Sequence, residues 1–303
     1  MKIVFTGLPY FSEKLVKELN EFDKKNYYLF FNTYYSFIDR LKFIFHTINA
    51  DLIVSFNGVS ANSKALNFAI LLNKKIWMQW HGSDVSIAKK AFKNNTIQLK
   101  YINHSKHFTD ATWLQKELTE IGIDSEIIHF KHVECKDENK SFITSNILTY
   151  MAEGKEAFYG LDIISEFAKK HPSIKVDIVG SSGKKIEPKH ENIKFHGWVD
   201  KNKMEELFHQ NAIFVRLTEH DGNSLSVIEA LANGNEVIWS QPHDMTNLAN
   251  NLDQFEKKVL ELQKKITERD FKANLQNIGW ARENANKEMV LKRLIEKIEQ
   301  IAK

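Results

Sequence analysis

The feature of this sequence that most restricts its fold is a regular alternation of short apolar runs with longer segments of helical period. In the first half of the chain, apolar runs lie at 2–7, 27–31, 51–56 and 75–80, and helical segments lie at 12–22, 37–48 and 63–72. Strands that alternate with helices run parallel, and the helices then cover both faces of the sheet. The alternation therefore predicts an α/β fold on a parallel sheet, with Ser12 expected to cap the first helix.

The alternation stops at a polar, charge-rich stretch, residues 131–141, and then begins again. The second set of apolar runs lies at 142–151, 175–180, 193–199, 212–218 and 236–240, and its helical segments lie at 160–172 and 202–210. A chain of 303 residues is also longer than most single cores grow. We therefore predict two Rossmann-like domains, 1–135 and 145–275, hinged near 133–145. The helical segment 276–303 is predicted to brace the two domains.

Charge and cysteine content narrow the class of protein. Lys plus Arg number 42 and Asp plus Glu number 39, and this near balance argues against nucleic acid as the partner. The single cysteine, Cys135, excludes an internal disulfide framework and fits a reducing compartment. No apolar run reaches the roughly 18 residues of a membrane span, and the N-terminal run is too short for a signal peptide. We therefore expect a cytoplasmic protein.

One segment, residues 26–45, gathers many aromatic side chains near basic ones. Two interpretations stay open for it. The segment is either a buried strand followed by a core helix, or a face that contacts the inner surface of a membrane peripherally.

The stretch TEHDGNSLSVIEALANGNEVIWS, residues 218–240, has the composition of a ligand loop. It follows a predicted strand, and ligands of doubly wound sheets bind beyond the carboxyl ends of strands. Gly222 allows close approach of the backbone, and Asp221 and Glu229 can accept hydrogen bonds from hydroxyl groups. Asn223, Ser224 and Leu225 are expected at the start of the next helix. Their amide N–H groups would point outward there and attract phosphate oxygens. Two acceptors around an anion site suit a nucleotide sugar.

The same stretch also has an explanation without a ligand. Residues 226–229 read SVIE, which is a capping box in which Ser226 and Glu229 satisfy backbone amide groups at a helix start. Asp221 followed by Gly222 is an ordinary turn signal. The residues alone leave both explanations open.

Several segments in the same order resemble glycosyltransferase family 4, the retaining transferases of GT-B fold. They are HGSDV at 81–85, the segments 110–123, 160–180 and 193–222, and the stretch 220–240, which contains the acid pair Asp221 and Glu229. The likeness extends from about residue 75 to residue 240. It implies two Rossmann-like domains whose parallel sheets face an interdomain cleft.

The resemblance implies a role for each matching residue. Asp221, where most members have glutamate, is expected to contact the transferred sugar, and His81 to reach that sugar from the N-terminal domain. Glu229 is expected to hold the ribose hydroxyl groups. The backbone positions expected around the donor are the loop Gly222, Asn223, Ser224 and Leu225, which faces sugar and phosphate, and Gly197 with Trp198, which face the base.

The diphosphate position departs from the family pattern. Members usually carry an arginine and a lysine after the first strand of the second domain, and this chain has Tyr159 at the lysine position. Lys155 and Arg216 are the two candidate cations, because the departing diphosphate gains negative charge. Gly7 and Asp84 are expected on the acceptor side, although Asp84 also has a simple explanation as a helix cap and His81 as a helix-entry residue.

No metal site is predicted. His129, His132 and Cys135 form one group and His104 with His107 another, but neither offers four nearby ligands.

The resemblance implies a retaining transferase that moves a hexosyl group from a nucleotide-diphosphate sugar to a glycan or lipid-linked acceptor. The nucleotide is expected to be UDP or GDP, and no metal ion or cofactor is expected. Such a reaction belongs to polysaccharide biosynthesis. Three alternatives stay open, because fold alone does not decide function. They are a non-catalytic subunit that binds nucleotide sugars, a sugar-nucleotide 2-epimerase, and a two-domain binding protein for small metabolites.

Overall fold

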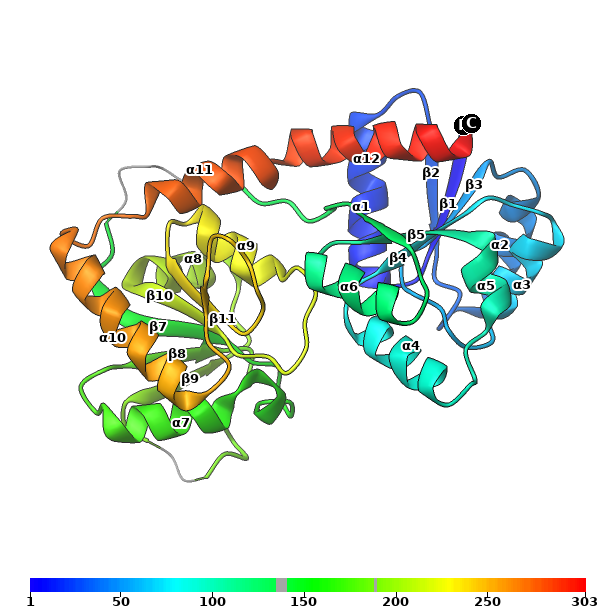
Figure 1. The fold of residues 1–303 in the computed structure, drawn as a ribbon. Helices are drawn as coiled ribbons and strands as arrows, with labels where there is room; N and C mark the ends of the chain where they lie inside the picture. The colour runs from blue at the N-terminus through cyan, green and yellow to red at the C-terminus, as the bar shows by residue number, and fades with distance from the viewer. Residues whose placement is uncertain (135–140, 188–189) are drawn as a thin grey trace. The chain divides into compact units, whose positions relative to one another are not determined.

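A computed structural model describes residues 1–134, 141–187 and 190–303. Residues 135–140 of the predicted hinge, which include the single cysteine, Cys135, lie outside the described residues. The chain forms two compact units: Met1–Phe130 with Glu288–Lys303, and Lys131–Lys287. Each unit has its own parallel sheet (Figure 1).

The N-terminal unit is built on a parallel sheet with strand order β2-β1-β3-β4-β5-β6. Its strands are β1 (Lys2–Thr6), β2 (Tyr27–Phe31), β3 (Leu52–Ser55), β4 (Ile76–Trp80), β5 (Ser105–Thr109) and β6 (Ser125–Ile127). Its helices are α1 (Pro9–Phe22), α2 (Phe37–Ile48), α3 (Lys64–Leu71), α4 (Ser83–Lys93), α5 (Leu99–His104), α6 (Thr112–Glu120) and α12 (Lys287–Ala302).

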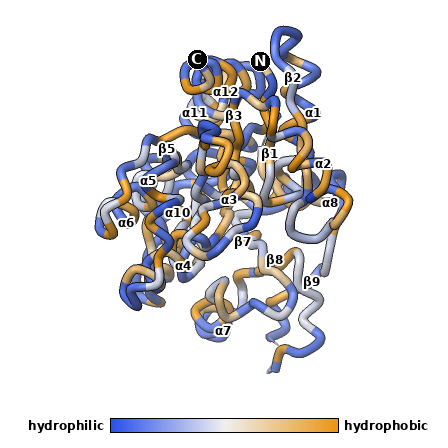
Figure 2. Tube along the Cα trace, turned by 90° about the vertical axis from the view of Figure 1, so that its right-hand side faces the viewer, coloured by the Kyte–Doolittle hydropathy of each residue, from blue (hydrophilic) through white to orange (hydrophobic). Residues whose placement is uncertain are grey.

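Both faces of this sheet are buried, because the strands alternate their side chains between two cores. Ile3 and Phe5 of β1 pack in one core with α1 and α12, whereas Val4 packs in the other with Phe43 of α2 and Leu66 of α3. Figure 2 shows the apolar residues of the strands in orange. The doubly covered parallel sheet predicted from the alternation is therefore confirmed.

The C-terminal unit repeats the architecture with strand order β12-β11-β10-β7-β8-β9, again parallel. Its strands are β7 (Thr144–Tyr150), β8 (Val176–Val179), β9 (Ile193–Gly197), β10 (Asn211–Arg216), β11 (Glu236–Trp239) and β12 (Asn247–Leu248). Its helices are the 3₁₀ turn η1 (Ala157–Tyr159), α7 (Leu161–Lys170), α8 (Lys201–Gln210), α9 (Leu225–Ala232), α10 (Leu252–Glu268) and α11 (Leu275–Asn284).

Each sheet has one point where the direction of winding reverses. In the C-terminal unit β8 and β9 extend from one side of β7, and the chain then returns to place β10 on the other side. In the N-terminal unit the reversal lies between β1 and β3. Loops that leave the carboxyl ends of such strand pairs diverge and leave room for a ligand. The loops after β7 and β10 and those after β1 and β3 are therefore the positions to search for a site.

Two local expectations concern the first helix and the last segment of the chain. The prediction that Ser12 caps α1 is wrong, because the helix begins at Pro9 and Ser12 lies inside its first turns, where its Oγ donates to the Gly7 carbonyl at 2.5 Å. Proline fixes a helical φ angle and is favoured at the first helical position, so it moves the start forward. The segment 276–303 forms parts of two helices: α11 packs on α9, and α12 packs in the N-terminal core. The bracing of the two domains stays a prediction.

Candidate functional site

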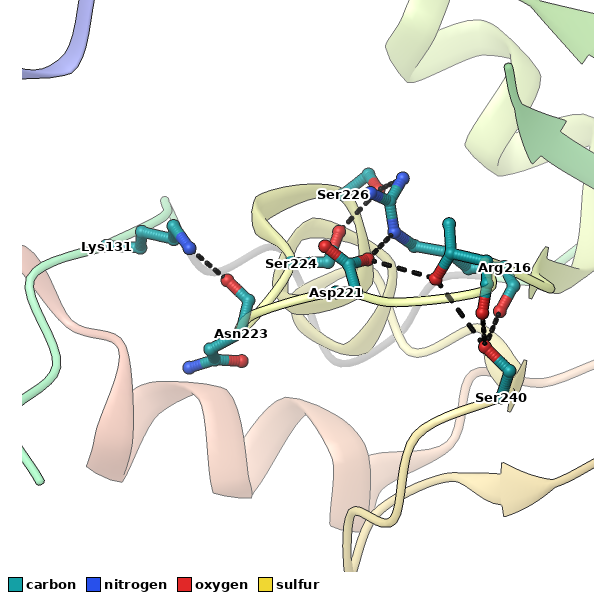
Figure 3. Close-up of polar contacts among 8 residues, drawn as sticks. Lys131, Arg216, Asp221, Asn223, Ser224, Ser226 and Ser240 are labelled. Carbon is teal, nitrogen blue, oxygen red and sulfur yellow. Dashed lines mark hydrogen bonds and ion pairs between the residues drawn. The ribbon is translucent and has the colours of Figure 1, made fainter. Parts of the chain in front are cut away.

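The loop between β10 and α9 brings two predicted site residues into direct contact. Arg216, the last residue of β10, donates through Nε to Oδ2 of Asp221, and Thr218 Oγ1 lies 3.4 Å from the same oxygen (Figure 3). Only 10% of the Arg216 side chain and 17% of the Asp221 side chain are exposed. The expected sugar-binding acid and one expected phosphate-binding cation thus form a largely buried ion pair at the reversal point of the sheet.

The guanidinium group of Arg216 is also held on its other sides. Its Cζ lies 5.2 Å from the centre of the Tyr159 ring, and its Nη1 lies 3.4 Å from Ser226 Oγ in the first turn of α9. Burial raises the pKa of the Tyr159 phenol above its usual value, although the charge of Arg216 acts in the opposite direction. Tyr159 is therefore neutral. Arg216 places its positive charge beside Tyr159, the position at which the resemblance leads us to expect a lysine.

The capping-box explanation of this stretch is wrong. Helix α9 starts at Leu225 with Ser224 as its N-cap, so Ser226 and Glu229 are displaced by two residues from the positions that a capping box requires. Within the described part of the chain, the Ser224 side chain makes no capping hydrogen bond, and its Oγ lies 3.0 Å from Ser226 Oγ instead. The first amide groups of α9 are therefore not capped by Ser224.

The loop is enclosed rather than open. Gly222 is buried, and Asn223 and Ser224 are 5% and 6% exposed. The ammonium group of Lys131, where the second unit begins, donates to the carbonyl of Asn223 (Figure 3). The backbone of this loop is therefore largely withdrawn from solvent, and Lys131 occupies one of its carbonyl groups. Sequence reasoning missed Lys131 because an isolated lysine beside a linker has no local signal.

Glu229 lies half-buried on α9, beyond the loop. Its charge adds to the field that raises the pKa of Lys201, after the larger contributions of the hydrogen bond and charge of Glu134.

In the loop after β7, the side chains that make hydrogen bonds are two glutamates, Glu153 and Glu156. Ser182 donates to Glu153 through its amide at 2.6 Å and its hydroxyl at 3.0 Å, and Ser181 Oγ donates to Glu156 at 2.5 Å. Burial alone raises the pKa of Glu156, but hydrogen bonds from Ser181 and the Gly154 amide outweigh it and hold the pKa below its usual range. Lys155 is exposed between these carboxylates. The glutamates were missed because their partners lie about 25 residues away in sequence.

At the carboxyl end of β9, the two residues expected near the base differ in environment. Gly197 has a φ of +66°, and its amide donates to the Ser181 carbonyl at 2.9 Å. Trp198 is 84% exposed. Because the Trp198 side chain is large, apolar and open to solvent, it is available to stack on a planar ligand.

In the N-terminal unit, His81 lies between β4 and α4. Its Nε2 is 3.2 Å from the Phe56 carbonyl, and its ring packs against Phe56 and Phe130 at centroid distances of 4.9 and 5.0 Å. The carboxylate of Asp84 accepts hydrogen bonds from the amides of His81 and Gly82 at 2.9 Å. Asp84 thus fixes the turn that carries His81, which matches its simpler explanation as a group that satisfies backbone at the helix start.

Gly7 lies at the reversal point of the N-terminal sheet. Its φ is +90°, and a Cβ there would lie 2.0 Å from Oδ1 of Asn57 in the loop after β3. That Oδ1 is buried and has no hydrogen-bond partner within the described residues. Buried acceptors are normally paired, so Asn57 is an additional candidate for contact with a ligand. Sequence reasoning passed over it because asparagine after a strand is an ordinary turn residue.

Among the described residues, no group of three or more His, Cys, Asp or Glu side chains has the arrangement of a metal site. His104 and His107 each place Nε2 against a backbone carbonyl, at 3.0 Å from Lys74 and 2.8 Å from Ile102.

Comparison with known proteins agrees with this architecture. Residues 146–264 match the family model for glycosyl transferases, group 1, and this range contains the β7 and β10 loops. No curated protein sequence matches the chain.

Solved structures are similar over most of this chain. HepE of Anabaena in complex with UDP and glucose has a TM-score of 0.69 at 11% identity, covering 99% of this chain and 100% of its own. The apo lipopolysaccharide outer core galactosyltransferase WaaB has a TM-score of 0.65 at 14% identity, covering 99% of both chains. The pneumococcal O-GlcNAc transferase GtfA, in complex with UDP and GlcNAc, has a TM-score of 0.61 at 13% identity over 86% of this chain, which spans 59% of that protein's length. The protein has the GT-B fold of glycosyltransferases.

Proposed function

We propose that this chain is a retaining glycosyltransferase of family 4 that transfers a hexosyl group from a nucleotide-diphosphate sugar to a glycan or lipid-linked acceptor. The observation that supports this most is the Arg216–Asp221 pair beside the start of α9, at the reversal point between β7 and β10. A cation, a carboxylate and the amide end of a helix then lie together where doubly wound sheets bind ligands.

The diphosphate lies, in this proposal, against the first turn of α9. The helix end carries partial positive charge, and Arg216 adds a full one. As the glycosidic bond breaks, negative charge moves onto the departing diphosphate, and these groups stabilise it without a metal ion or cofactor. Lys155, exposed on the β7 loop, is a second cation for the same oxygens.

The remaining predicted residues contact the sugar and the nucleoside of the donor. Asp221 accepts hydrogen bonds from the sugar hydroxyl groups once the ligand displaces part of its contact with Arg216, and Glu229 accepts those of the ribose. Trp198 and the backbone of Gly197 take the base. His81 and Gly7 belong to the domain that binds the acceptor, which attacks on the face from which the diphosphate leaves. The presence of UDP in the structures of HepE and GtfA favours UDP over GDP. We place this activity in the cytoplasm, in polysaccharide biosynthesis.

One alternative has a specific observation in its favour. The β7 loop carries Glu153 and Glu156, whereas the resemblance leads us to expect cations there. The loop between β10 and α9 is also largely buried. A non-catalytic subunit that binds nucleotide sugars would tolerate both features. Such a subunit binds UDP without releasing it from a UDP-sugar, whether or not an acceptor is added.

Calorimetric titration with UDP and GDP, followed by assay of UDP release from UDP-sugars, tests the proposal. We expect UDP to bind, and Glu229→Gln to weaken binding about tenfold, because a hydrogen bond to a charged group contributes roughly 1.5–3 kcal/mol. Glu206→Gln, on the exposed side of α8, serves as the control and should bind as the wild type does. Wild-type affinity in the Glu229 variant would remove the ribose role, and binding without turnover would favour the non-catalytic subunit.

A further inference from the structure

Helix α2 has two apolar faces, and only one of them is used by the fold. Phe43 is 1% exposed and Thr47 fully buried, so this side of the helix packs in the N-terminal core. The opposite side carries six large apolar side chains that are between 42% and 69% exposed: Phe37, Ile38, Leu41, Ile44, Phe45 and Ile48. We call these six residues the α2 stripe.

The α2 stripe is continuous along the helix. At about 100° per residue its members fall within an arc of about 120°, roughly opposite to Phe43 and Thr47. Tyr34 and Tyr35, which precede the helix, are 49% and 83% exposed. Leu71, on the neighbouring helix α3, is 78% exposed. Contiguous exposed apolar surface of this kind marks an interaction site.

Cations border the α2 stripe on both sides. By the same helical geometry Arg40 and Lys42 lie about 40° beyond its two edges. Arg40 donates to the carbonyls of Thr33 at 2.8 Å and Tyr34 at 2.7 Å, and so holds the loop that carries both tyrosines. These acceptors are neutral, so they leave the positive charge uncompensated.

Further basic residues lie around the same helix. At its end, Lys74 Nζ donates to the carbonyl of Ile48 at 2.7 Å. Residues 27–75 contain five Lys or Arg side chains and two Asp or Glu side chains. The neighbourhood of the stripe is therefore positively charged, although the whole chain is nearly balanced.

We propose that the α2 stripe docks on the surface of an anionic lipid bilayer. A helix with an apolar arc bordered by Lys and Arg lies in the plane of the interface, with its apolar side chains below the headgroups and its cations among the phosphates. Tyrosine is favoured at that depth. Helix α2, labelled in Figure 2, has 12 residues and is about 18 Å long.

Docking in the plane of the membrane is separate from crossing it. In the described ranges of the chain, no helix combines the length and the apolar character that crossing a bilayer requires. The flanking cations are complementary in charge to the phosphate groups of an anionic lipid surface, and they lie where those groups would meet the helix. The inference does not depend on sugar transfer, since the surface and its charges are independent of the donor site.

Flotation with vesicles tests the proposal. The wild-type protein is expected to float with phosphatidylcholine vesicles that contain phosphatidylglycerol, and less with phosphatidylcholine alone. Phe45→Glu should lower the partition coefficient at least tenfold, since one buried phenylalanine contributes about that factor. Lys42→Gln should weaken binding several-fold at low salt, and the difference should shrink at high salt because added ions screen the charge.

Ile87→Glu is the matched control, because Ile87 is 58% exposed on α4 of the same unit. It should bind vesicles as the wild type does, and thermal unfolding of all variants should show that the fold is retained. Absence of wild-type binding to the anionic vesicles, or equal losses from Phe45→Glu and Ile87→Glu, would overturn the proposal. A dimer in sedimentation velocity that Phe45→Glu dissociates would also overturn it and assign the stripe to a second copy of the chain. These outcomes do not involve nucleotide binding, so they are distinct from failure of the proposed function.

Discussion

Arg216 and Asp221 are better described as one unit than as two independent ligand contacts. Their side chains are joined and largely withdrawn from water, and Tyr159 and Ser226 lie around the guanidinium group. A charge in such a place requires its partner, since the desolvation cost of an unpaired ion is large. The pair therefore stabilises the loop between β10 and α9 even before any ligand binds.

Removal of one partner should reveal this dependence. We expect Asp221→Ala to lower the free energy of unfolding by about 3 kcal/mol, because it leaves Arg216 buried and unpaired. Glu206→Ala breaks an exposed pair with Lys203 on α8 and should change the stability far less, because solvent screens that pair. Urea unfolding of the two variants measures both values. Similar small costs would show that the Arg216–Asp221 contact contributes little to the folded state.

His107 gives a pH dependence whose sign can be stated. The ring is buried, Trp80 donates to its Nδ1 at 3.1 Å, and its Nε2 faces the Ile102 carbonyl. Burial lowers the pKa of His107, although the contact with Ile102 acts in the opposite direction. The unfolded chain then binds a proton more readily than the folded one. Stability is fully present above the unfolded pKa of about 6.5 and is lost as the pH falls through the folded pKa.

Thermal unfolding between pH 7.5 and 5.5 measures this effect. The melting temperature of the wild type should fall with pH, and the fall should be smaller in His107→Gln, which cannot take up the proton. His190→Gln, a change at a half-buried position, is the control and should keep the wild-type slope. An unchanged slope in the His107 variant would assign the pH dependence to other groups.

At the scale of elements, sequence period and structure agree closely, and the differences have local causes. Helix α2 has the bounds that the sequence predicts, yet its exposed face is as apolar as its buried one. Period alone identifies an apolar stripe but not which side of the helix packs on the sheet. Of the two interpretations left open for residues 26–45, the strand is realised and the helix is only partly buried.

The turn into α7 offers a paired test of backbone conformation. Gly154 and Gly160 have φ angles of +75° and +74°, but only at Gly160 would a Cβ meet another group, the Cβ of Leu217 at 2.7 Å. We expect Gly154→Ala to cost about 1–2 kcal/mol, which is the cost of the left-handed conformation. Gly160→Ala should cost clearly more, because the β10 loop must also move. Denaturant unfolding compares the two, and equal costs would mean that the contact with Leu217 relaxes freely.

At the scale of the whole molecule, the last helix belongs to the core of the first domain. Val290, Leu291, Leu294, Ile298 and Ile301 of α12 pack with strands β1 and β3. The N-terminal unit therefore includes residues from both ends of the chain. The order of apolar runs could not reveal this, because an amphipathic terminal helix fits any exposed sheet face equally well.

A core substitution in α12 should lower the stability of the N-terminal unit alone. Leu294 is 3% exposed, and we expect Leu294→Ala to destabilise the N-terminal unit by about 2–5 kcal/mol. Arg293→Ala, on the exposed side of the same helix, should have little effect. Hydrogen exchange should become faster in β1 and β3 and stay unchanged in β7 and β10. Faster exchange in β7 would contradict the assignment of α12 to the N-terminal core.

The sequence by itself determined most of the elements, their parallel arrangement and the loop between β10 and α9 as the place where a ligand is expected. These follow from short-range patterns: period, helix-start residues and the composition of one loop. It also supplied Asp221, Glu229 and Arg216 as candidates, because each lies in or beside that loop. The short strands β5, β6 and β12 lie outside the predicted runs.

Only the tertiary structure decided which of these groups meet. The pairing of Arg216 with Asp221, the contact of Lys131 with the Asn223 carbonyl, and the packing of α12 all join groups through space. The free energy of such contacts depends on burial and on distance between side chains, and neither is a property of a local stretch of sequence. Burial likewise decided that one apolar face of α2 packs in the core while the other remains at the surface.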